Sequence, residues 1–407
     1  MTIQRRFAPI SGRIDRNIQR QSRLALVIKE LEMEIRLATQ HDVVVCNEFY
    51  NRTHHQKRSL AQWQWEFLPR DFPADVIPYV IITDHGKIIG TQAFIPIRMI
   101  DERGVFWTVK SEETFLDPSY RGQKLFEKMY EILFGFLKRH SIHCVWGFTP
   151  ATRAFERIGF AIPQITSQVF FPFTGLAVTA VREKHTDDER DGLVSRVKVL
   201  GYRGAGSMAS IYSSLCYRVL SRIRSDELSG FDVHGLDSAP PQAGDLSERF
   251  IRLYGGMTIY RDAAYLQWRL FDNPYVKAIM LGAFIQGQLV GWIAYAIGDD
   301  GMGYIIDIIA APLTDSNQTR SRIIARLIVE AVDALRRAGA LGVRGWHINE
   351  HPFDTMILKE AKRLGFYHIK RGHSVVLYTN PESDRRETIK SFDRWFVTRI
   401  FTEGWMG

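Results

Sequence analysis

Cysteine is scarce in this sequence, and no long apolar run occurs in it. The three cysteines, Cys46, Cys144 and Cys216, stand far apart and form no CxxC pair, which disfavours a disulfide framework or a zinc site and fits a reducing cytoplasm. No stretch of about eighteen apolar residues is present, so no membrane-spanning segment is expected. The first residues carry charges but no apolar core followed by a small-residue cleavage site, so no secretory signal is expected. These absences predict a cytoplasmic protein without a bound metal.

The composition indicates folded domains and an anionic partner. The chain has 407 residues, of which 45% are hydrophobic and 12% aromatic, enough for roughly two or three domains with their own cores. Its net charge of +8 and pI of about 9.3 suit a CoA-like cofactor, a nucleic acid or an anionic membrane surface. Because the basic residues are spread along the chain, no clear nucleic-acid site is predicted.

Residues 1–32 form a basic N-terminal extension. From Ile14 onward its apolar residues recur at roughly helical spacing, and arginines stand at positions 5, 6, 13, 16, 20 and 23. A basic amphipathic helix either packs on its own protein, which is the usual fate of an apolar stripe, or lies on a membrane surface or a partner. The extension is therefore a weak indication of membrane-surface contact.

The pattern of residues 33–175 predicts one α+β domain. An antiparallel meander of strands leads through a long strand into an amphipathic helix, a further strand, a short helix and a last strand. The hairpin Asp84-His85-Gly86-Lys87 joins two strands of the meander. The expected elements are strands at 33–37, 79–83, 88–95, 105–116 and 142–148, and helices from Thr39, at 121–139 and at 150–157.

The same order returns in residues 229–380. The segment Gly287-Gln288-Leu289-Val290-Gly291 matches Gly86-Lys87-Ile88-Ile89-Gly90. A self-similarity with a period of roughly 200 residues indicates an internal duplication. The expected elements are strands at 278–285, 289–297, 304–310, 342–348 and 374–378, and helices at 319–338 and 353–363. Residues 176–228 are expected to be a linker with a helix at 207–224, and residues 381–407 a C-terminal tail.

The stretch from Glu112 to Phe126 begins as a strand and ends in the first turn of a helix. Pro118 and Gly122 lie in the turn between them. A strand that runs into a helix N-terminus presents unpaired backbone N–H groups and the positive end of the helix dipole, which suits a phosphate or pyrophosphate. Arg121 adds a planar fork of donors at the same place.

This order of elements and the residues Leu116-x-Pro118-x-x-Arg121-Gly122-x-x-x-Phe126 resemble the GNAT family of acyl-CoA-dependent N-acyltransferases. The segment Ala154-Phe155-x-x-x-Gly159-Phe160 is similar to the family's closing helix-to-strand signature. The resemblance implies an α+β fold of two GNAT-like units, each a mixed, mostly antiparallel sheet flanked by helices. The segments Trp63–Phe67 and Trp268–Pro274 are similar to GNAT-related proteins of bacterial polysaccharide gene clusters.

The resemblance also implies how acetyl-CoA or another acyl-CoA is held. The phosphates bind to Arg121 and to the backbone N–H groups of Gly122, Gln123, Lys124, Leu125 and Phe126. The strand residues Thr114, Phe115 and Leu116 pair with the pantetheine arm, and a backbone N–H near Phe115 polarises the thioester carbonyl.

Acyl transfer to an amine further needs a base for the ammonium. Glu112 and Glu113 are candidates, because charged residues are unusual in the centre of an apolar strand. Adjacent strand residues face opposite sides, so one of the two is expected to face the cleft. The alternative is that one or both pair with a neighbouring arginine or lysine. Phe155 stands where the family often has the tyrosine that protonates the leaving thiolate, so the general acid is missing or comes from elsewhere.

Departures from the family pattern affect both turns. Lys124 stands where the family usually has glycine, and Phe126 where it has glycine or alanine. A Lys124 side chain directed outward adds charge for phosphate, whereas one directed inward obstructs the site. In the second copy the turn at 310–320 has no glycine and carries Asp315, which predicts a degenerate copy that shapes the acceptor cleft or a dimer contact.

The expected function is transfer of an acyl group, first of all acetyl, from CoA to a small-molecule amine. The resemblance to polysaccharide-cluster proteins favours an amino sugar of a polysaccharide or glycoconjugate pathway as acceptor. Two alternatives stay open: a Fem-type transferase that uses aminoacyl-tRNA, and a non-catalytic binding protein with the same fold.

Overall fold

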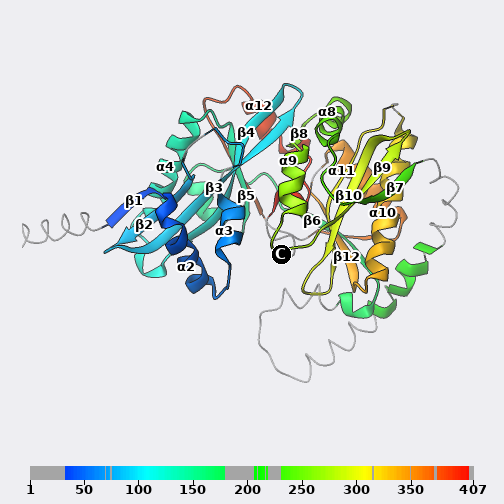
Figure 1. The fold of residues 1–407 in the computed structure, drawn as a ribbon, viewed down its shortest axis with the longest axis horizontal. Helices are drawn as coiled ribbons and strands as arrows, with labels where there is room; N and C mark the ends of the chain where they lie inside the picture. The colour runs from blue at the N-terminus through cyan, green and yellow to red at the C-terminus, as the bar shows by residue number, and fades with distance from the viewer. Residues whose placement is uncertain are drawn as a thin grey trace, which may run out of the picture. The chain divides into compact units, whose positions relative to one another are not determined.

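The computed structural model describes most of the chain, and its elements follow the expected α+β order (Figure 1). The N-terminal extension 1–32 and most of the linker 176–228 lie outside the described residues, so the expectations for them stay predictions. The described residues are 33–178, 206–218 and 231–402, apart from 69, 74, 75, 209, 216, 314, 315, 349 and 371–373. By contacts the chain divides into two compact units, the first of residues 1–95 and 111–136 and the second of residues 96–110 and 137–407.

Within the described part of the chain, the strands form two mixed sheets of seven strands each. The first has the order β1-β2-β3-β4-β5-β14, with β8 paired to β3, and the second has the order β13-β6-β12-β11-β10-β9-β7. The strands of the first sheet are β1 (Met33–Leu37), β2 (Tyr79–Asp84), β3 (Lys87–Asp101), β4 (Gly104–Leu116), β5 (Cys144–Thr149), β8 (Met257–Ile259) and β14 (Ser374–Thr379). Those of the second are β6 (Ser167–Pro172), β7 (Asp232–Leu236), β9 (Ile279–Ile285), β10 (Gln288–Ile297), β11 (Gly303–Ala310), β12 (Gly342–His347) and β13 (Tyr367–Ile369).

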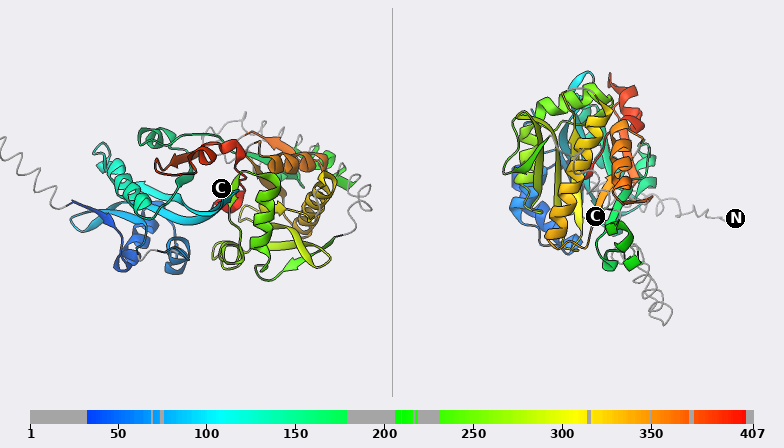
Figure 2. Two further views of the ribbon diagram at one scale, coloured as in Figure 1. Left: turned by 90° about the horizontal axis from the view of Figure 1, so that it is seen from above. Right: turned by 90° about the vertical axis from the view of Figure 1, so that its right-hand side faces the viewer.

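Helices flank the strands and bury their apolar stripes. In the first unit, α4 buries Met129, Leu133 and Phe136 completely; in the second, α10 packs along β10 and β11 (Figures 1 and 2). None of the described helices is long and apolar enough to cross a membrane. The helices are α2 (Val43–His54), α3 (Leu60–Phe67), α4 (Leu125–Arg139), α5 (Thr152–Arg157), α8 (Ala243–Tyr254), α9 (Ala263–Leu266), α10 (Asn317–Arg337), α11 (Pro352–Arg363) and α12 (Arg386–Lys390).

The turn between β4 and α4 is longer than the sequence predicted. A 3-10 turn at Pro118–Tyr120 follows the strand, and the helix begins at Leu125. The predicted helix start at Arg121 is therefore wrong. Gly122 and Lys124 have positive φ angles of 83° and 57°, and a residue in the left-handed region cannot continue a right-handed helix.

The last strand of each repeat pairs in the sheet of the other repeat. β6, which ends the first repeat, pairs antiparallel with β12, from Ser167–His347 to Pro172–Gly342. β14, which ends the second repeat, pairs antiparallel with β5, from Ser374–Thr149 to Thr379–Cys144. The contiguous domains expected at 33–175 and 229–380 therefore do not coincide with the two sheets.

The C-terminal segment packs into the second unit. Phe396 and Ile400 are completely buried. The Thr258 hydroxyl donates to the Phe396 carbonyl at 2.7 Å, and Trp395 forms a parallel bridge with Met257 beside it. Residues 392–401 thus supply large apolar side chains to the core of the second unit.

Candidate active site

Glu112 and Glu113 form an irregular step in β4. Glu113 has a φ of 50°, which interrupts the alternation of faces that the sequence prediction assumed. Two side chains of β3 bind the carbonyls at this step: the Thr91 hydroxyl donates to that of Glu113 at 3.2 Å, and Gln92 Nε2 donates to that of Glu112 at 3.2 Å. Side chains of β3 therefore help to fix the backbone of β4 at this irregular step.

The Glu113 side chain is clamped inside the first unit. Arg58 Nη1 and Nη2 donate to its two oxygens at 2.6 and 3.3 Å, and the Tyr79 hydroxyl donates to it as well. The Arg58 and Glu113 side chains are only 4% and 3% exposed, so both charges are largely removed from water. Burial raises the pKa of Glu113, while the Arg58 charge opposes that rise. Glu113 thus forms an ion pair with an arginine, which was the alternative to a role as base in the sequence analysis.

Strand β11 of the second repeat is also irregular at the matching place. When Pro312 is aligned with Pro118, Asp307 aligns with Glu113. The antiparallel ladder of β11 with β10 shifts register there, which leaves Ile306 between paired residues. Glu113 and Asp307 thus occupy equivalent positions in the two repeats.

Asp307 is also clamped by an arginine. Arg261 Nε donates to Asp307 Oδ2 at 2.9 Å and Nη2 donates to Oδ1 at 3.0 Å, and both side chains are fully buried. Trp292 Nε1 and the Thr398 hydroxyl donate to the same carboxylate at 2.9 and 2.6 Å. A buried carboxylate is costly without such partners, so this donor set accounts for its presence in the core.

Both arginines belong to a repeated motif that opens a helix. The motif reads Arg58-Ser59-x-Ala61-x-x-Gln64-Trp65 in the first repeat and Arg261-Asp262-x-Ala264-x-x-Gln267-Trp268 in the second. Ser59 and Asp262 are the N-caps of α3 and α9: the Ser59 hydroxyl accepts from Gln62 N at 3.2 Å and the Asp262 carboxylate from Tyr265 N at 2.8 Å. Only the tryptophan segments of this motif were used to interpret the sequence. The arginine that precedes each of them is repeated as well, and it could have been identified from the sequence in the same way.

The turn after β4 lies at the surface at residues 121–124. Its first part is closed by Asp117, which accepts from Ser119 N at 2.9 Å. Among the described residues, no acceptor faces the N–H groups of residues 122–125, and the first bond of α4 runs from Lys128 N to the Lys124 carbonyl at 3.1 Å. Arg121 and Lys124 are exposed beside these donors, so the Lys124 side chain does not plug the turn. The donors, the dipole of α4 and two cations together suit an anion.

The matching turn of the second unit is capped by its own side chain. Ser316 is the N-cap of α10, and its hydroxyl accepts from Thr319 N at 3.0 Å and pairs with the Thr319 hydroxyl at 2.7 Å. The predicted acidic obstacle, Asp315, lies outside the described residues. Because the protein itself satisfies part of this donor set, the turn after β4 is the better anion site of the two.

In both repeats the central parallel strands pair over two residues only. The pairs are Val109–Val145 and Lys110–Trp146 between β4 and β5, and Gly303–Val343 and Tyr304–Arg344 between β11 and β12. The resemblance to GNAT proteins implies such a separation of strands, since the backbone beyond the last pair is then available to a pantetheine arm.

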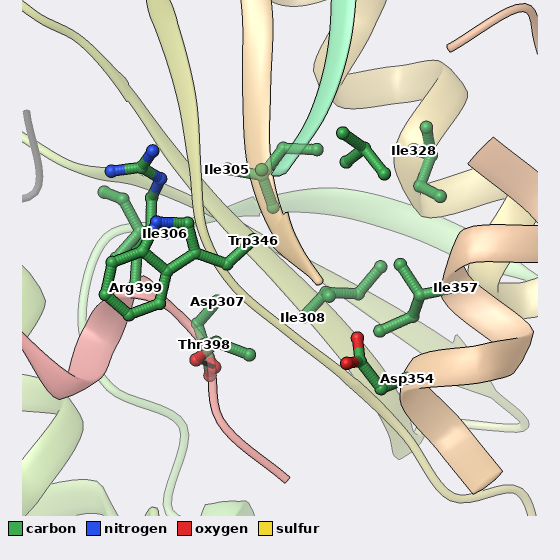
Figure 3. Close-up of a pocket in the computed structure, with 12 residues that line it drawn as sticks. Ile305, Ile306, Asp307, Ile308, Ile328, Trp346, Asp354, Ile357, Thr398 and Arg399 are labelled. Atoms are coloured by element: carbon green, nitrogen blue, oxygen red, sulfur yellow. Dashed lines mark hydrogen bonds between the residues drawn. The ribbon is translucent and has the colours of Figure 1, made fainter. Parts of the chain in front are cut away.

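Side chains fill the space beyond the last pair of β11 and β12 (Figure 3). The Arg399 guanidinium lies over the Trp346 ring, 5.2 Å from its centroid. The cavity that remains among Ile308, Asp354 and their neighbours has a volume of about 20 Å³, which is room for about one water molecule. A pantetheine arm does not fit into this cavity.

Phe115, near the end of β4, packs against α2. Its ring centroid lies 5.6 Å from those of Phe49 and His54. Burial, and after it the charge of Arg58, lowers the pKa of His54, which favours the neutral imidazole, the form that accepts a proton. His54 is therefore a third titratable group at the end of β4, which the sequence did not single out.

Phe155 is a residue of the core. It is 3% exposed, and its ring meets that of Phe160 edge-on at 5.0 Å. The position at which the family often carries an acidic tyrosine is thus used for packing.

Comparison with known proteins shows the fold. No family model and no curated protein matches the sequence. A GCN5-related N-acetyltransferase from Anabaena variabilis matches the structure with a TM-score of 0.55 at 10% identity, over 86% of this chain and 73% of that one. A probable N-acyltransferase from Enterococcus faecalis (0.52, 8% identity, 86% and 72% covered) and the N-myristoyltransferase of Saccharomyces cerevisiae with bound myristoyl-CoA (0.52, 9%, 86% and 83%) match similarly. The chain therefore has the α+β fold of GNAT-type acyltransferases, as the sequence predicted.

Proposed function

We propose that the chain is an acyl-CoA-dependent N-acyltransferase that binds its cofactor at the first repeat. The observation that carries this proposal is the turn after β4, where no described acceptor faces the N–H groups of residues 122–125 and Arg121 stands beside them. Such donors at the positive end of a helix dipole suit a pyrophosphate. The fold shared with solved acyltransferases supports the same reading.

Each part of the turn has a role in holding acyl-CoA. Arg121 takes a phosphate through its guanidinium, and the Lys124 side chain adds a second cation. The backbone donors of the pyrophosphate site are the N–H groups of Gly122, Gln123, Lys124, Leu125 and Phe126. The backbone groups of Thr114, Phe115 and Leu116, beyond the two residues of β4 that pair with β5, receive the pantetheine arm.

The irregular step of β4 orients the backbone N–H that polarises the thioester carbonyl. The deprotonated amine attacks the thioester carbon, and a backbone N–H near Phe115 stabilises the oxyanion that forms. Collapse of this intermediate releases the CoA thiolate and leaves the acyl group on nitrogen. Because Arg58 and Tyr79 hold the Glu113 side chain, we assign Glu113 to fixing the irregular step of β4.

The base that deprotonates the ammonium is then Glu112 or His54. The two are distinguished by the pH dependence of kcat/KM in the variants Glu112→Gln and His54→Gln. The ascending limb of the profile reports the free enzyme's base, so it disappears in the variant that lacks that base and persists in the other.

For the acceptor, we propose a small amine and first an amino sugar, because of the resemblance of the segments around Trp63 and Trp268 to polysaccharide-cluster proteins. For the donor, acetyl-CoA is the first candidate. A panel of acyl-CoAs of increasing chain length, scored by thermal stabilisation, identifies the preferred acyl group, since a ligand of the native state raises the midpoint with its affinity.

Calorimetry with acetyl-CoA tests the proposal directly. We expect binding that Arg121→Ala weakens about tenfold, the effect of losing one charge-assisted contact. Arg252→Ala is the matched control, because this exposed arginine lies on α8, and its binding should equal that of the unsubstituted protein. Absence of binding by every acyl-CoA of the panel would refute the assignment.

A further inference from the structure

A buried network of polar side chains joins β3, β4 and α4 in the first unit. Gln92 and Tyr130 are completely buried, and Ser111 is nearly so. Ser111 Oγ lies 2.7 Å from the Tyr130 hydroxyl, and either oxygen can donate. Gln92 Nε2 donates to Ser111 Oγ at 3.1 Å, and its Oε1 accepts from the Thr114 hydroxyl. These bonds hold the Tyr130 hydroxyl on β4, just before the irregular step of the strand.

The ring of Tyr130 is enclosed by other aromatic rings. Its centroid lies 5.0 Å from that of Phe126 and 5.7 Å from that of Phe134, one turn of α4 before and after it. The Phe94 ring of β3 meets it edge-on, at 5.9 Å between centroids. Tyr130 therefore fills the space between α4 and this part of the sheet, and it is fixed there by its ring and by its hydroxyl.

The network lies at the position that the acyl group of the proposed cofactor reaches. In the proposed complex the phosphates bind at residues 122–126, and the pantetheine arm runs back along residues 114–116. The thioester is the end of that arm farther from the phosphates, so the acyl group extends toward Ser111. It cannot continue between β4 and β5, because Lys110 pairs with Trp146. The acyl group therefore meets the hydrogen-bonded side chains of the network.

We propose that Ser111 and Tyr130 are specificity-determining residues that admit a short acyl group, such as acetyl or propionyl, and exclude medium and long chains. The proposal rests on the proposed acyltransferase function. A longer chain has to displace a ring that its neighbours and a buried hydrogen bond hold in place. Extra methylenes in a packed interior force side chains out of their rotamers, and a displaced Tyr130 loses its bond to Ser111. Both costs oppose the gain from burying a longer chain.

Calorimetry of the full-length protein with acetyl-CoA and octanoyl-CoA tests the limit. We expect acetyl-CoA to bind the unsubstituted protein at least about tenfold more tightly than octanoyl-CoA does. Tyr130→Leu removes the ring and its hydroxyl, so the affinity for octanoyl-CoA should rise about tenfold while that for acetyl-CoA changes less than about twofold. Phe134→Leu is the matched control, because it truncates an aromatic side chain one turn further along α4, and it should keep the preference for acetyl-CoA.

Circular dichroism and the thermal midpoint show whether each variant is folded. If Tyr130→Leu does not fold, Tyr130→Met is the second variant, because methionine refills part of the space adaptably; its affinity for octanoyl-CoA should rise about threefold.

The possible failures are distinguishable. Absence of binding by either acyl-CoA would refute the proposed function and this inference with it. Octanoyl-CoA that binds the unsubstituted protein as tightly as acetyl-CoA does would leave the proposed function intact and overturn the limit. An equal gain for octanoyl-CoA in Phe134→Leu and Tyr130→Leu would also overturn it, because the gain would then come from a general loosening of α4.

Discussion

Replacing Arg58 by methionine tests the clamp on Glu113. Methionine fills an apolar space adaptably and removes the cation. The Glu113 carboxylate then loses a donor at 2.6 Å, and Glu66, whose Oε2 lies 3.4 Å from Arg58 Nη1, loses the same countercharge. Two largely buried carboxylates remain without the cation that they share.

The expected loss is large and depends on pH. Removing one partner of a buried ion pair lowers the free energy of unfolding by about 3–5 kcal/mol. Burial already raises the pKa of Glu113, and loss of Arg58 raises it further. A protonated carboxyl group has no charge to bury, so the loss is full at pH values above the raised pKa and shrinks as pH falls toward the unfolded value of about 4.3.

Urea unfolding of a double-mutant cycle measures the coupling. We expect Arg58→Met/Glu113→Gln to be more stable than the sum of the single losses predicts, by about 0.5–3 kcal/mol. Arg52→Met is the matched control, because this arginine of α2 is exposed and its loss should cost no more than about 0.5 kcal/mol. Strict additivity of Arg58→Met and Glu113→Gln, with a loss that is the same at all pH values, would refute the reasoning.

Three further predictions concern other sites. Arg261→Met should lower the free energy of unfolding by a similar amount of about 3–5 kcal/mol in urea, since its partner Asp307 is fully buried; a loss below that of an exposed arginine would contradict this. Lys124→Gly should raise the free energy of unfolding by about 1 kcal/mol, because Lys124 has a φ of 57°. The same variant should bind acetyl-CoA severalfold more weakly in calorimetry, because a cation is lost. Tighter binding would show that the Lys124 side chain obstructs the site. Burial lowers the pKa of His351 to about 4, so the free energy of unfolding should fall by up to about 3 kcal/mol as pH drops from roughly 6.5 to 4. In His351→Gln this part of the pH dependence should be absent.

Local sequence patterns were sufficient to predict most elements of the fold. β4 was expected at 105–116 and spans Gly104–Leu116, because its length and apolar content distinguish it within the chain itself. The exchange of β6 and β14 between the sheets was not predictable in this way. It depends on pairing between β6 and β12, whose residues are about 175 positions apart in the chain. Local sequence patterns do not distinguish between the two sheets as partners for such a strand. The start of α4 was misjudged for a local reason: lysine does not by itself indicate a left-handed φ, and the only hint was that the resembling family usually has glycine at this position.

The candidate site shows the same division between local and distant information. Arg121 and Gly122 follow from the turn signal, and the structure shows unsatisfied donors at this turn among the described residues. Arg58 and Tyr79 were missed because their contact with Glu113 joins residues 55 and 34 positions apart. A charged residue in an apolar strand indicates that a partner exists, but it does not indicate which residue the fold brings there.

The two repeats agree where their residues are buried and differ where they are exposed. The clamps Arg58–Glu113 and Arg261–Asp307 occur in both, and loss of either leaves an uncompensated charge in a core, so the fold itself demands them. The turns carry no such demand, because their backbone donors are satisfied equally well by a side-chain cap, by water or by a ligand. Ser316 supplies that cap in the second repeat, whereas in the first no described acceptor faces the N–H groups of residues 122–125, next to the exposed Arg121. The difference between the two turns is therefore the reason to look for the proposed cofactor site in the first repeat and not in the second.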